Sequence, residues 1–397
     1  MIRRSLIFLL ILLLAMIRVT PASAGRVEYS PKGVLSFTES TPWGDMTAVF
    51  TYCLANNLFT FSTVNLDGVR ANSGQWSDNI GPFLADSKWI GANHLDSAGN
   101  PTAVSVSVEI AVDENYIDAS ADLTAECKIL TIKVKNLIAL TKTEPFAWEY
   151  VTYTVAGNSI EVEVEHEYIC HRPVSVASYY GMQSMFVGEK EMLLPGSGLG
   201  NWFPVNGSAN VSFTKKDAPD ANLFIESNGV AMQATYLLRE GLGEHTCISD
   251  KDNIFIHSDN DKSYHSLMRY HNVEPGETTR WHGIYSWFRS PVKDTFVSHD
   301  EEPYVVYGAY IAGAPYLVTA FDDGRITTAP YVRPVEKKYY SDYRVLNSGV
   351  MVSDAETGLS IFDTAGRLVG SGSGLHRLGS GIYIINNRRR QEKVRVR

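Results

Sequence analysis

Five groups of side chains in this sequence could transfer protons or bind a ligand. They combine histidines, tyrosines, carboxylates and amides: Asn93 with His94; Glu165, His166, Glu167 and His171; Tyr179, Tyr180 and Gln183; His265 with His271; and Arg280 with His282. Two reactions fit this inventory. Glycoside hydrolysis needs two carboxylates flanking the scissile bond. Eliminative cleavage of a uronate needs a base, often Tyr or His, and a cation or amide that neutralises the sugar carboxylate.

The stretch from Ser159 to Phe186 joins a strand pattern to several of these groups. Every second residue from Glu161 to Glu167 is a glutamate, and the residues between them are apolar except for His166. A period of two sends the two sets to opposite faces of a sheet. We expect the glutamate face to be solvated, so this alternation separates the glutamates from His166.

The candidate catalytic residues are His94, His166, Tyr179, Tyr180 and His282. Each could serve as acid, base or carboxylate neutraliser. Structural alternatives exist for all of them: a loop histidine bonded to backbone, a satisfied core histidine, and tyrosines that pack or stack on sugars. Neighbouring residues of an extended chain point to opposite faces, so only one of the two tyrosines is expected to enter a site. His282 can face either a cleft or the core.

Six further residues are candidates for substrate binding: Trp76, Trp89, Asn93, Arg172, Gln183 and Trp202. Tryptophan rings stack on sugars, and an arginine binds a carboxylate through paired hydrogen bonds, although a surface role for Arg172 is the simpler alternative. The sequence contains no zinc motif of the His-Glu-two-spacer-His type, no phosphate loop, no nucleotide fingerprint and no nucleophile elbow. We therefore expect no metal and no cofactor.

The first 24 residues have the parts of a secretory signal peptide: two arginines, an apolar run from Leu6 to Ile17, and a small-residue end at Ala24. No later stretch is long and apolar enough to span a bilayer, so we expect a mature chain without a transmembrane anchor. The formal net charge of −9 argues against nucleic acid as a partner. The four cysteines permit disulfides in an exported chain, and free buried thiols are the equal alternative.

The body of the chain is patterned as strands. Six segments are rich in Val, Ile, Thr and aromatic residues: Met46 to Tyr52, Phe59 to Val64, Thr102 to Val112, Ile129 to Val134, Trp148 to Val155 and Ser159 to Tyr168. A seventh region, Lys262 to Phe288, forms strands around a turn at Glu274 to Glu277, whereas Asn72 to Gly99 is expected to be a long connection. These patterns predict an all-β protein with a large antiparallel β-sandwich.

The chain from about Tyr343 has short runs of four to six residues between Gly, Ser and Asn turns, typical of a small strand module. Three of its segments resemble the C-terminal sorting domain of type IX secretion substrates from Bacteroidetes: Ile361-Phe362-Asp363 with Gly366-Arg367-Leu368-Val369, Gly381 to Ile385, and the basic end. This resemblance implies export through the outer membrane, with the secretion machinery as a partner and a secreted or cell-surface location.

The body is similar to the galactose-mutarotase-like superfamily, which includes aldose epimerases and β-sandwich domains of many hydrolases and lyases. The similarity lies in Lys262 to His265, Val273 to Glu277 and Gly283 to Tyr285. It implies a fold and no particular activity.

Together these features predict three segments: a signal peptide at 1–24, a large β-sandwich domain at 25–330, and a linker with a small C-terminal β-sandwich sorting domain at 331–397. We expect an exported carbohydrate-active protein, a polysaccharide lyase or glycoside hydrolase whose partner is an extracellular poly- or oligosaccharide. The alternative is a non-catalytic surface glycan-binding protein, in which the tryptophans and tyrosines stack on sugar rings.

Overall fold

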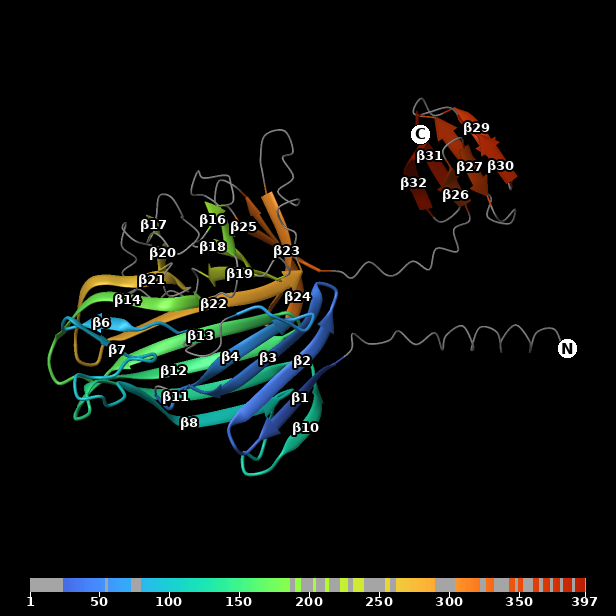
Figure 1. The fold of residues 1–397 in the computed structure, drawn as a ribbon. Coiled ribbons are helices and arrows are strands. Elements are labelled where there is room, and N and C mark those ends of the chain that lie inside the picture. Colours follow the sequence, from blue (N-terminus) through green and yellow to red (C-terminus); the bar gives the residue numbers. More distant parts are fainter. Residues whose placement is uncertain are drawn as a thin grey trace. The chain divides into compact units, whose positions relative to one another are not determined.

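The computed structural model describes residues 24–53, 56–72, 80–185, 190–193, 203–204, 211–213, 222–227, 231–238, 254–257, 262–289, 304–321, 326–331, 343–346, 349–352, 360–363, 367–371, 374–378, 381–387 and 390–396. Every regular element among them is a β-strand (Figure 1). Within these ranges there is accordingly no helix that could cross a membrane. The prediction of an all-β protein built from antiparallel sheets is confirmed. The chain divides into two compact units, Met1–Tyr331 and Val332–Arg397.

A ten-stranded antiparallel sheet forms one layer of the first unit. Its order is β16 (Phe203–Pro204), β15 (Lys190–Leu193), β18 (Asn222–Ser227), β19 (Ala231–Leu238), β22 (Thr278–Arg289), β13 (Ser159–Tyr168), β12 (Glu144–Ala156), β11 (Leu130–Thr141), β8 (Ala103–Val112) and β9 (Asn115–Tyr116). Burial alternates along β11, β12 and most of β13. We call the face that carries the buried apolar side chains the inner face and the opposite one the outer face.

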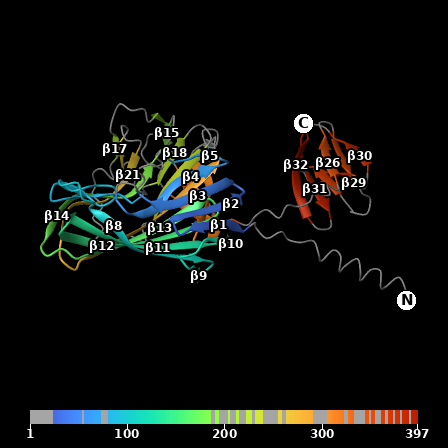
Figure 2. The ribbon, with the colours of Figure 1, turned by 60° about the horizontal axis from the view of Figure 1, so that its bottom comes forward.

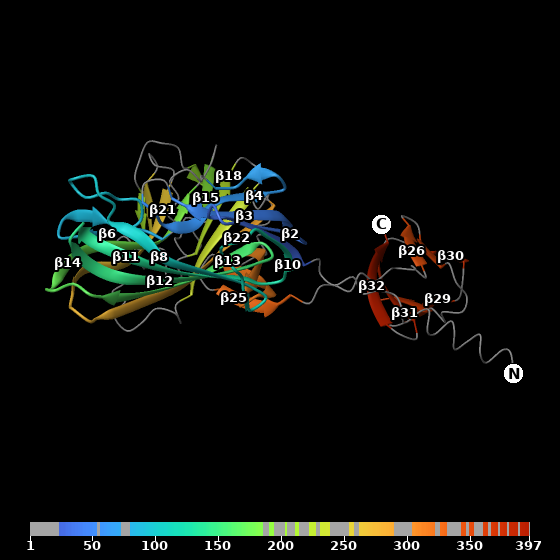
Figure 3. The same ribbon diagram turned by 90° about the horizontal axis from the view of Figure 1, so that it is seen from below.

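Two six-stranded sheets cover the inner face. The first has the order β10 (Leu123–Cys127), β1 (Gly25–Ser30), β2 (Val34–Thr41), β3 (Gly44–Tyr52), β4 (Phe59–Leu66) and β5 (Val69–Arg70). The second has the order β17 (Val211–Phe213), β20 (Ile254–His257), β21 (Lys262–Val273), β14 (Val174–Met185), β6 (Phe83–Ala85) and β7 (Lys88–Ile90). Figures 2 and 3 show the blue strands β2, β3 and β4 lying over the green strands of the ten-stranded sheet.

Aromatic side chains fill the space between the layers. Phe61 of the first six-stranded sheet has its ring centroid 5.3 Å from that of Tyr285 and 6.0 Å from that of Trp287, both on β22. Phe83 of the second six-stranded sheet stacks on Tyr179 at 4.0 Å and meets Phe146 of β12 edge to face at 5.2 Å. Burying each such ring contributes roughly 1.5–3 kcal/mol, so these contacts hold the layers together.

A three-stranded sheet covers one end of the outer face. It consists of β23 (Tyr304–Ile311), β24 (Ala314–Phe321) and β25 (Ile326–Pro330). Tyr307 stacks on Phe288 of β22 with a centroid distance of 5.4 Å, and the Tyr310 backbone N–H donates to Ser159 Oγ at 2.9 Å. The outer face is therefore covered beside the β13–β22 pair at this end.

The second unit consists of two small antiparallel sheets. One has the order β26 (Tyr343–Leu346), β27 (Gly349–Val352) and β30 (Gly374–Arg377); the other has the order β29 (Leu368–Ser371), β28 (Ser360–Asp363), β31 (Gly381–Asn387) and β32 (Arg390–Val396). The short runs between Gly, Ser and Asn are thus strands, as their spacing predicts.

The six predicted strands of the body correspond to β3, β4, β8, β11, β12 and β13, and the turn at Glu274 to Glu277 separates β21 from β22. The expectation of a long connection without strands at Asn72 to Gly99 is wrong, because this stretch contains β6 and β7. Asp86 and Ser87, which join these two strands, have φ values of 46° and 64°. That left-handed turn is usually signalled by Gly or Asn, and this segment has neither at those positions.

No disulfide links any two of Cys53, Cys127 and Cys170. Cys127 is fully buried, and burial raises the pKa of its thiol to about 12. Cys247 lies outside the described residues. The free buried thiol is the alternative that holds for Cys127 and Cys170.

Candidate functional site

A groove of about 320 Å³ lies on the outer face of the ten-stranded sheet, where β12, β13 and β22 run side by side. Eight residues line the groove: Tyr150, Thr152, Glu163, Val164, Glu165, Arg280, Trp281 and His282. The side chains of Val164 and Trp281 are buried on the inner face, so the other six residues supply the side chains of the groove. We refer to it as the outer-face groove. Its polar and charged side chains converge on one space, a property it shares with sites that bind small molecules.

Strand pairing explains why these side chains meet. In the β13–β22 register, Glu163 lies opposite His282 and Glu165 lies opposite Arg280. In the β12–β13 register, Tyr150 lies opposite Glu165. Residues directly opposite on one face have Cβ atoms about 5 Å apart, so the pairing brings together groups that are over 100 residues apart in sequence.

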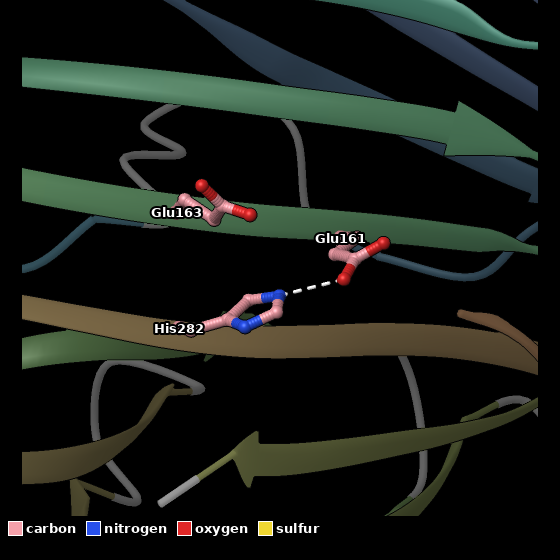
Figure 4. Close-up of side chains that lie close together, drawn as sticks. All are labelled: Glu161, Glu163 and His282. Carbon is pink, nitrogen blue, oxygen red and sulfur yellow. Dashed lines mark hydrogen bonds and ion pairs between the residues drawn. The ribbon is translucent and has the colours of Figure 1, made fainter. Parts of the chain in front are cut away.

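A short polar contact at the groove joins His282 to Glu161. His282 Nε2 lies 2.6 Å from Glu161 Oε1, and the dashed line in Figure 4 marks this bond. The other carboxylate oxygen, Oε2, accepts the backbone N–H of Ala312 at 2.8 Å, from the turn between β23 and β24. The Glu161 side chain is 9% exposed and that of His282 is 22% exposed. A largely buried, anchored carboxylate thus fixes a partly exposed imidazole.

This geometry determines the tautomer of His282. An ionised carboxylate only accepts hydrogen bonds, so Nε2 carries the hydrogen that it donates to Glu161. In the neutral imidazole Nδ1 is then the lone-pair nitrogen, able to take a proton. His282 is therefore oriented as a proton acceptor by a carboxylate, the arrangement that supports general base catalysis.

Glu163 completes a set of three residues that could hold a metal ion. One ligand atom each of Glu161, Glu163 and His282 lies within 4.8 Å of the other two (Figure 4). Imidazole with carboxylates is a donor set that divalent transition metals accept. His282 Nε2, however, is engaged with Glu161 Oε1, and the same atoms serve the proton-transfer arrangement described above.

Four of the sequence-predicted residues gather elsewhere, beside β14 on the side of the second six-stranded sheet that faces away from the ten-stranded sheet. Trp89 of β7 stacks on His94 at a centroid distance of 5.8 Å and on Tyr180 of β14 at 5.6 Å. Asn93 directly precedes His94 in the chain. Arg269 Nη1 lies 3.4 Å from the Tyr180 hydroxyl. We call Trp89, His94 and Tyr180 the aromatic stack; it belongs to the second six-stranded sheet, separate from the groove.

His166 and Tyr179 lie in the core. Their exposed fractions are 0% and 1%. His166 Nε2 lies 3.0 Å from Glu149 Oε2, and the hydroxyl of Tyr179 accepts the indole N–H of Trp281 at 2.9 Å. Burial raises the pKa of Tyr179 well above its ordinary value, so this phenol is held in its protonated form. Both residues are assigned to packing, because substrate cannot reach them and their polar atoms are satisfied.

The remaining predicted binding residues are scattered. Arg172 donates to Asp86 Oδ2 at 2.7 Å and to Glu144 Oε1 at 3.1 Å, so it is a surface ion-pair residue. Gln183 is buried, at 1% exposure. Trp76 and Trp202 lie outside the described residues.

Sequence reasoning paired Arg280 with His282 but placed Glu161 among the solvated glutamates. Glu161 is 7% exposed and contacts His282, so that expectation is wrong for this one residue, because the turn at Ala312 covers it. Tyr150 was missed as well. The alternation places Glu161, Glu163 and Glu165 on one face, but it carries no information about which strand lies beside them.

Comparison with known proteins yields neither a matching family model nor a matching curated protein. Among solved structures, a GH36 α-galactosidase from Geobacillus stearothermophilus shares 10% identity at a TM-score of 0.39, covering 66% of this chain and 41% of its own. An aldose 1-epimerase from Klebsiella pneumoniae shares 10% identity at a TM-score of 0.35, covering 64% and 83%. The heparan sulfate lyase from Pedobacter heparinus shares 8% identity at a TM-score of 0.30, covering 76% and 41%.

This chain therefore spans about two fifths of the length of the galactosidase and the lyase. The neighbours include glycoside hydrolases, a polysaccharide lyase and an epimerase with a galactose-mutarotase-like fold. At these identities and TM-scores, the likeness establishes no common activity.

Proposed function

We propose that this protein is an exported carbohydrate-active enzyme that cleaves an extracellular glycan in the outer-face groove. The observation that carries this proposal is the bond between His282 Nε2 and Glu161 Oε1 at the wall of a groove that also presents Arg280 and an aromatic ring, Tyr150. An oriented base and a cation are the groups that eliminative cleavage of a uronate requires, and the ring adds a stacking surface for a sugar.

Each of these residues takes a distinct role. His282 accepts at Nδ1 the proton from the carbon beside the uronate carboxylate, and Glu161 stabilises the imidazolium that forms. A C=C bond forms as the glycosidic C–O bond breaks, and the imidazolium returns its proton to the leaving oxygen. Arg280, which is exposed and lies across from Glu165, binds and neutralises an acidic group of the sugar. Tyr150, with an exposed fraction of 36%, provides a ring for sugar stacking.

Eliminative cleavage fits this site better than hydrolysis. Elimination requires a base and a group that neutralises the uronate, and His282 with Arg280 supplies both. The glutamates that line the groove, Glu163 and Glu165, stand side by side on β13. Hydrolysis requires two carboxylates on opposite sides of the bond, a geometry that two residues of one strand face do not provide.

Export is part of the proposal and rests on sequence features: the signal-like segment at 1–24 and the resemblance of residues 343–397 to a type IX sorting domain. We expect a secreted or cell-surface location, with the outer-membrane secretion machinery as a partner. Mass spectrometry of the protein from its native host tests this, since both terminal segments should be missing from the extracellular form.

The activity is tested by incubating the chain from residue 25 with a panel of acidic and neutral polysaccharides. Ultraviolet absorbance of an unsaturated uronate marks elimination, and new reducing ends without that absorbance mark hydrolysis. Loss of product in His282→Gln, with retained product in Lys88→Gln on a distant strand, supports the site. Absence of product from every glycan would contradict the enzyme proposal.

A non-catalytic glycan-binding protein is the second candidate. The aromatic stack favours it, because Trp89 is 38% exposed and its ring is nearly parallel to those of His94 and Tyr180, at 20° and 23°. Binding without product, lost in Trp89→Ala and kept in His282→Gln, would establish this function in place of cleavage.

A further inference from the structure

The outer face continues beyond the groove as a row of lysines and aromatic rings. Lys135 of β11 places its Nζ atom 4.1 Å from the ring centroid of Trp148 and 5.2 Å from that of Tyr150, both on β12. Lys133, two residues earlier, donates to the Tyr116 hydroxyl of β9 at 3.3 Å. We call Tyr116, Lys133, Lys135, Trp148 and Tyr150 the lysine–aromatic track.

The track is partly exposed and continuous with the groove: Lys133 is exposed, whereas Lys135 and Trp148 are half-buried. Tyr116 is 61% exposed, and Tyr150, which belongs both to the track and to the groove lining, is 36% exposed. Rings held under ammonium groups form cation–π pairs, which keep both partners in place before a ligand arrives. The track therefore presents ordered cations and rings to solvent.

The direction of the track follows from strand pairing. Arg280, Glu165, Tyr150 and Lys135 are successive cross-strand neighbours on β22, β13, β12 and β11. Neighbouring strands lie about 4.8 Å apart. That spacing is close to the length of one pyranose unit in a glycan chain, so a chain that crosses the strands meets a new side chain at nearly every sugar.

We propose that an acidic glycan runs across the strands from the outer-face groove along the lysine–aromatic track, with its carboxylate or sulfate groups bound by Lys135 and Lys133. This inference rests on the proposed function, which it extends from the cleavage site to the binding of the rest of the substrate. Tyr150 and Trp148 contribute ring surface to the sugars, and the lysines select for acidic chains over neutral ones.

The two lysines contribute unequally. The cross-strand neighbours of Lys135 are Ser107 and Tyr150, both uncharged. Lys133 lies across from Glu109, which offsets part of its charge. Lys135 therefore dominates the attraction for the acidic groups.

Titration calorimetry tests the proposal with acidic oligosaccharides of two and six sugars and with neutral chains of the same lengths. The chain from residue 25 is used, with His282→Gln wherever the wild type cleaves the ligand. We expect affinity to rise with length for the acidic series only. Lys135→Gln should weaken hexasaccharide binding about tenfold, Lys133→Gln less, and neither should change disaccharide binding.

Lys88→Gln is the matched control, since it removes one charge from an exposed lysine on β7 of another sheet. Hexasaccharide affinity that is equal in Lys135→Gln and Lys88→Gln, while the protein still binds or cleaves glycans, would overturn the track and leave the proposed function standing. Equal affinity for acidic and neutral chains would also overturn the track. Failure of the wild type to bind any glycan would overturn both.

Discussion

His282 and Glu161 form a hydrogen-bonded pair across the β13–β22 boundary, with 2.6 Å between Nε2 and Oε1. The two residues are not direct cross-strand partners, because Glu163 occupies the position opposite His282. Glu161 reaches the imidazole diagonally and is held there by the Ala312 N–H. The orientation of the imidazole therefore depends on the packing of the β23–β24 turn on the large sheet.

Glu161→Gln should inactivate the base without removing it. The amide oxygen of glutamine would accept the Ala312 N–H, so its NH₂ group would face His282 and require a lone pair on Nε2. The hydrogen of the neutral imidazole would then move to Nδ1, where the base needs a lone pair. We expect kcat to fall about 10²-fold with little change in KM, as for other general bases.

The same steady-state assay separates orientation from mere destabilisation. His282→Gln should lose at least as much kcat as Glu161→Gln, and the double variant should be no worse than His282→Gln alone, because the two residues act as a unit. Glu126→Gln, on β10 away from the groove, is the control. Full activity in Glu161→Gln would refute the role of this carboxylate.

A row of hydrogen-bonded side chains is buried on the inner face, and the loss of one of them should lower the stability of the protein. Glu149 accepts the Asn136 amide at 2.9 Å and lies 3.0 Å from His166, whose other nitrogen lies 3.3 Å from Thr279. Glu149→Leu leaves Asn136 and His166 buried without this partner. We expect the free energy of unfolding to fall by about 3 kcal/mol in urea titrations, the usual cost of breaking a buried pair.

A much smaller loss of unfolding free energy would mean that these hydrogen bonds contribute little to stability. The paired substitution, Glu149→Leu with His166→Leu, provides the check. Because it removes both partners, it should cost less than the sum of the single changes.

His265 should make the protein less stable in mild acid. Burial lowers the pKa of this histidine from 6.5 to about 4, and neither ring nitrogen has a hydrogen-bond partner among the described residues. Between these two values the unfolded chain binds the proton and the folded chain does not, so stability falls as pH falls from about 6.5 toward 4. From pH 7 to pH 5 the loss is about 2 kcal/mol.

His265→Met, which fills the site without a titrating group, should remove that part of the pH dependence. Urea titrations at pH 7 and pH 5 of both proteins give the test, and the quantity compared is the change between the two pH values. An identical change in wild type and His265→Met would show that His265 is protonated in the folded state as readily as in the unfolded one.

The sequence predicts the sheets better than the site, for a physical reason. Alternation along Ser159–Tyr168 is a local property, and it correctly assigns His166 to the inner face and Glu163, Glu165 and Glu167 to the outer face. The neighbours of a strand are set by pairing between distant segments. Nothing local to Glu161 indicates that β22 lies beside it or that Ala312 covers it, so its contact with His282 could not be anticipated.

Exposure is equally non-local. Tyr179 and Tyr180 are correctly predicted to point to opposite faces, and only Tyr180 lies on the outer side, in the aromatic stack. Which of the two faces is covered depends on Phe83 from a segment almost 100 residues earlier, which stacks on Tyr179. The sequence pattern therefore predicts which side chains share a face of the sheet, and tertiary packing determines which of the two faces is buried.

Glu39 should have the opposite pH dependence to His265. Burial raises the pKa of this carboxyl from 4.5 to about 7, although one oxygen accepts the Gly157 N–H at 2.8 Å. Above pH 4.5 the unfolded chain releases the proton while the folded chain keeps it, so stability falls as pH rises toward and through 7.

Glu39→Gln keeps an acceptor for Gly157 and cannot ionise. It should raise the free energy of unfolding at pH 8, relative to pH 5, by about 2.5 kcal/mol over wild type. Urea titrations at the two pH values measure this difference, and Glu126→Gln on an exposed position should show none. A Glu39→Gln protein that gains nothing at pH 8 would mean that the carboxylate of Glu39 is solvated in the folded state.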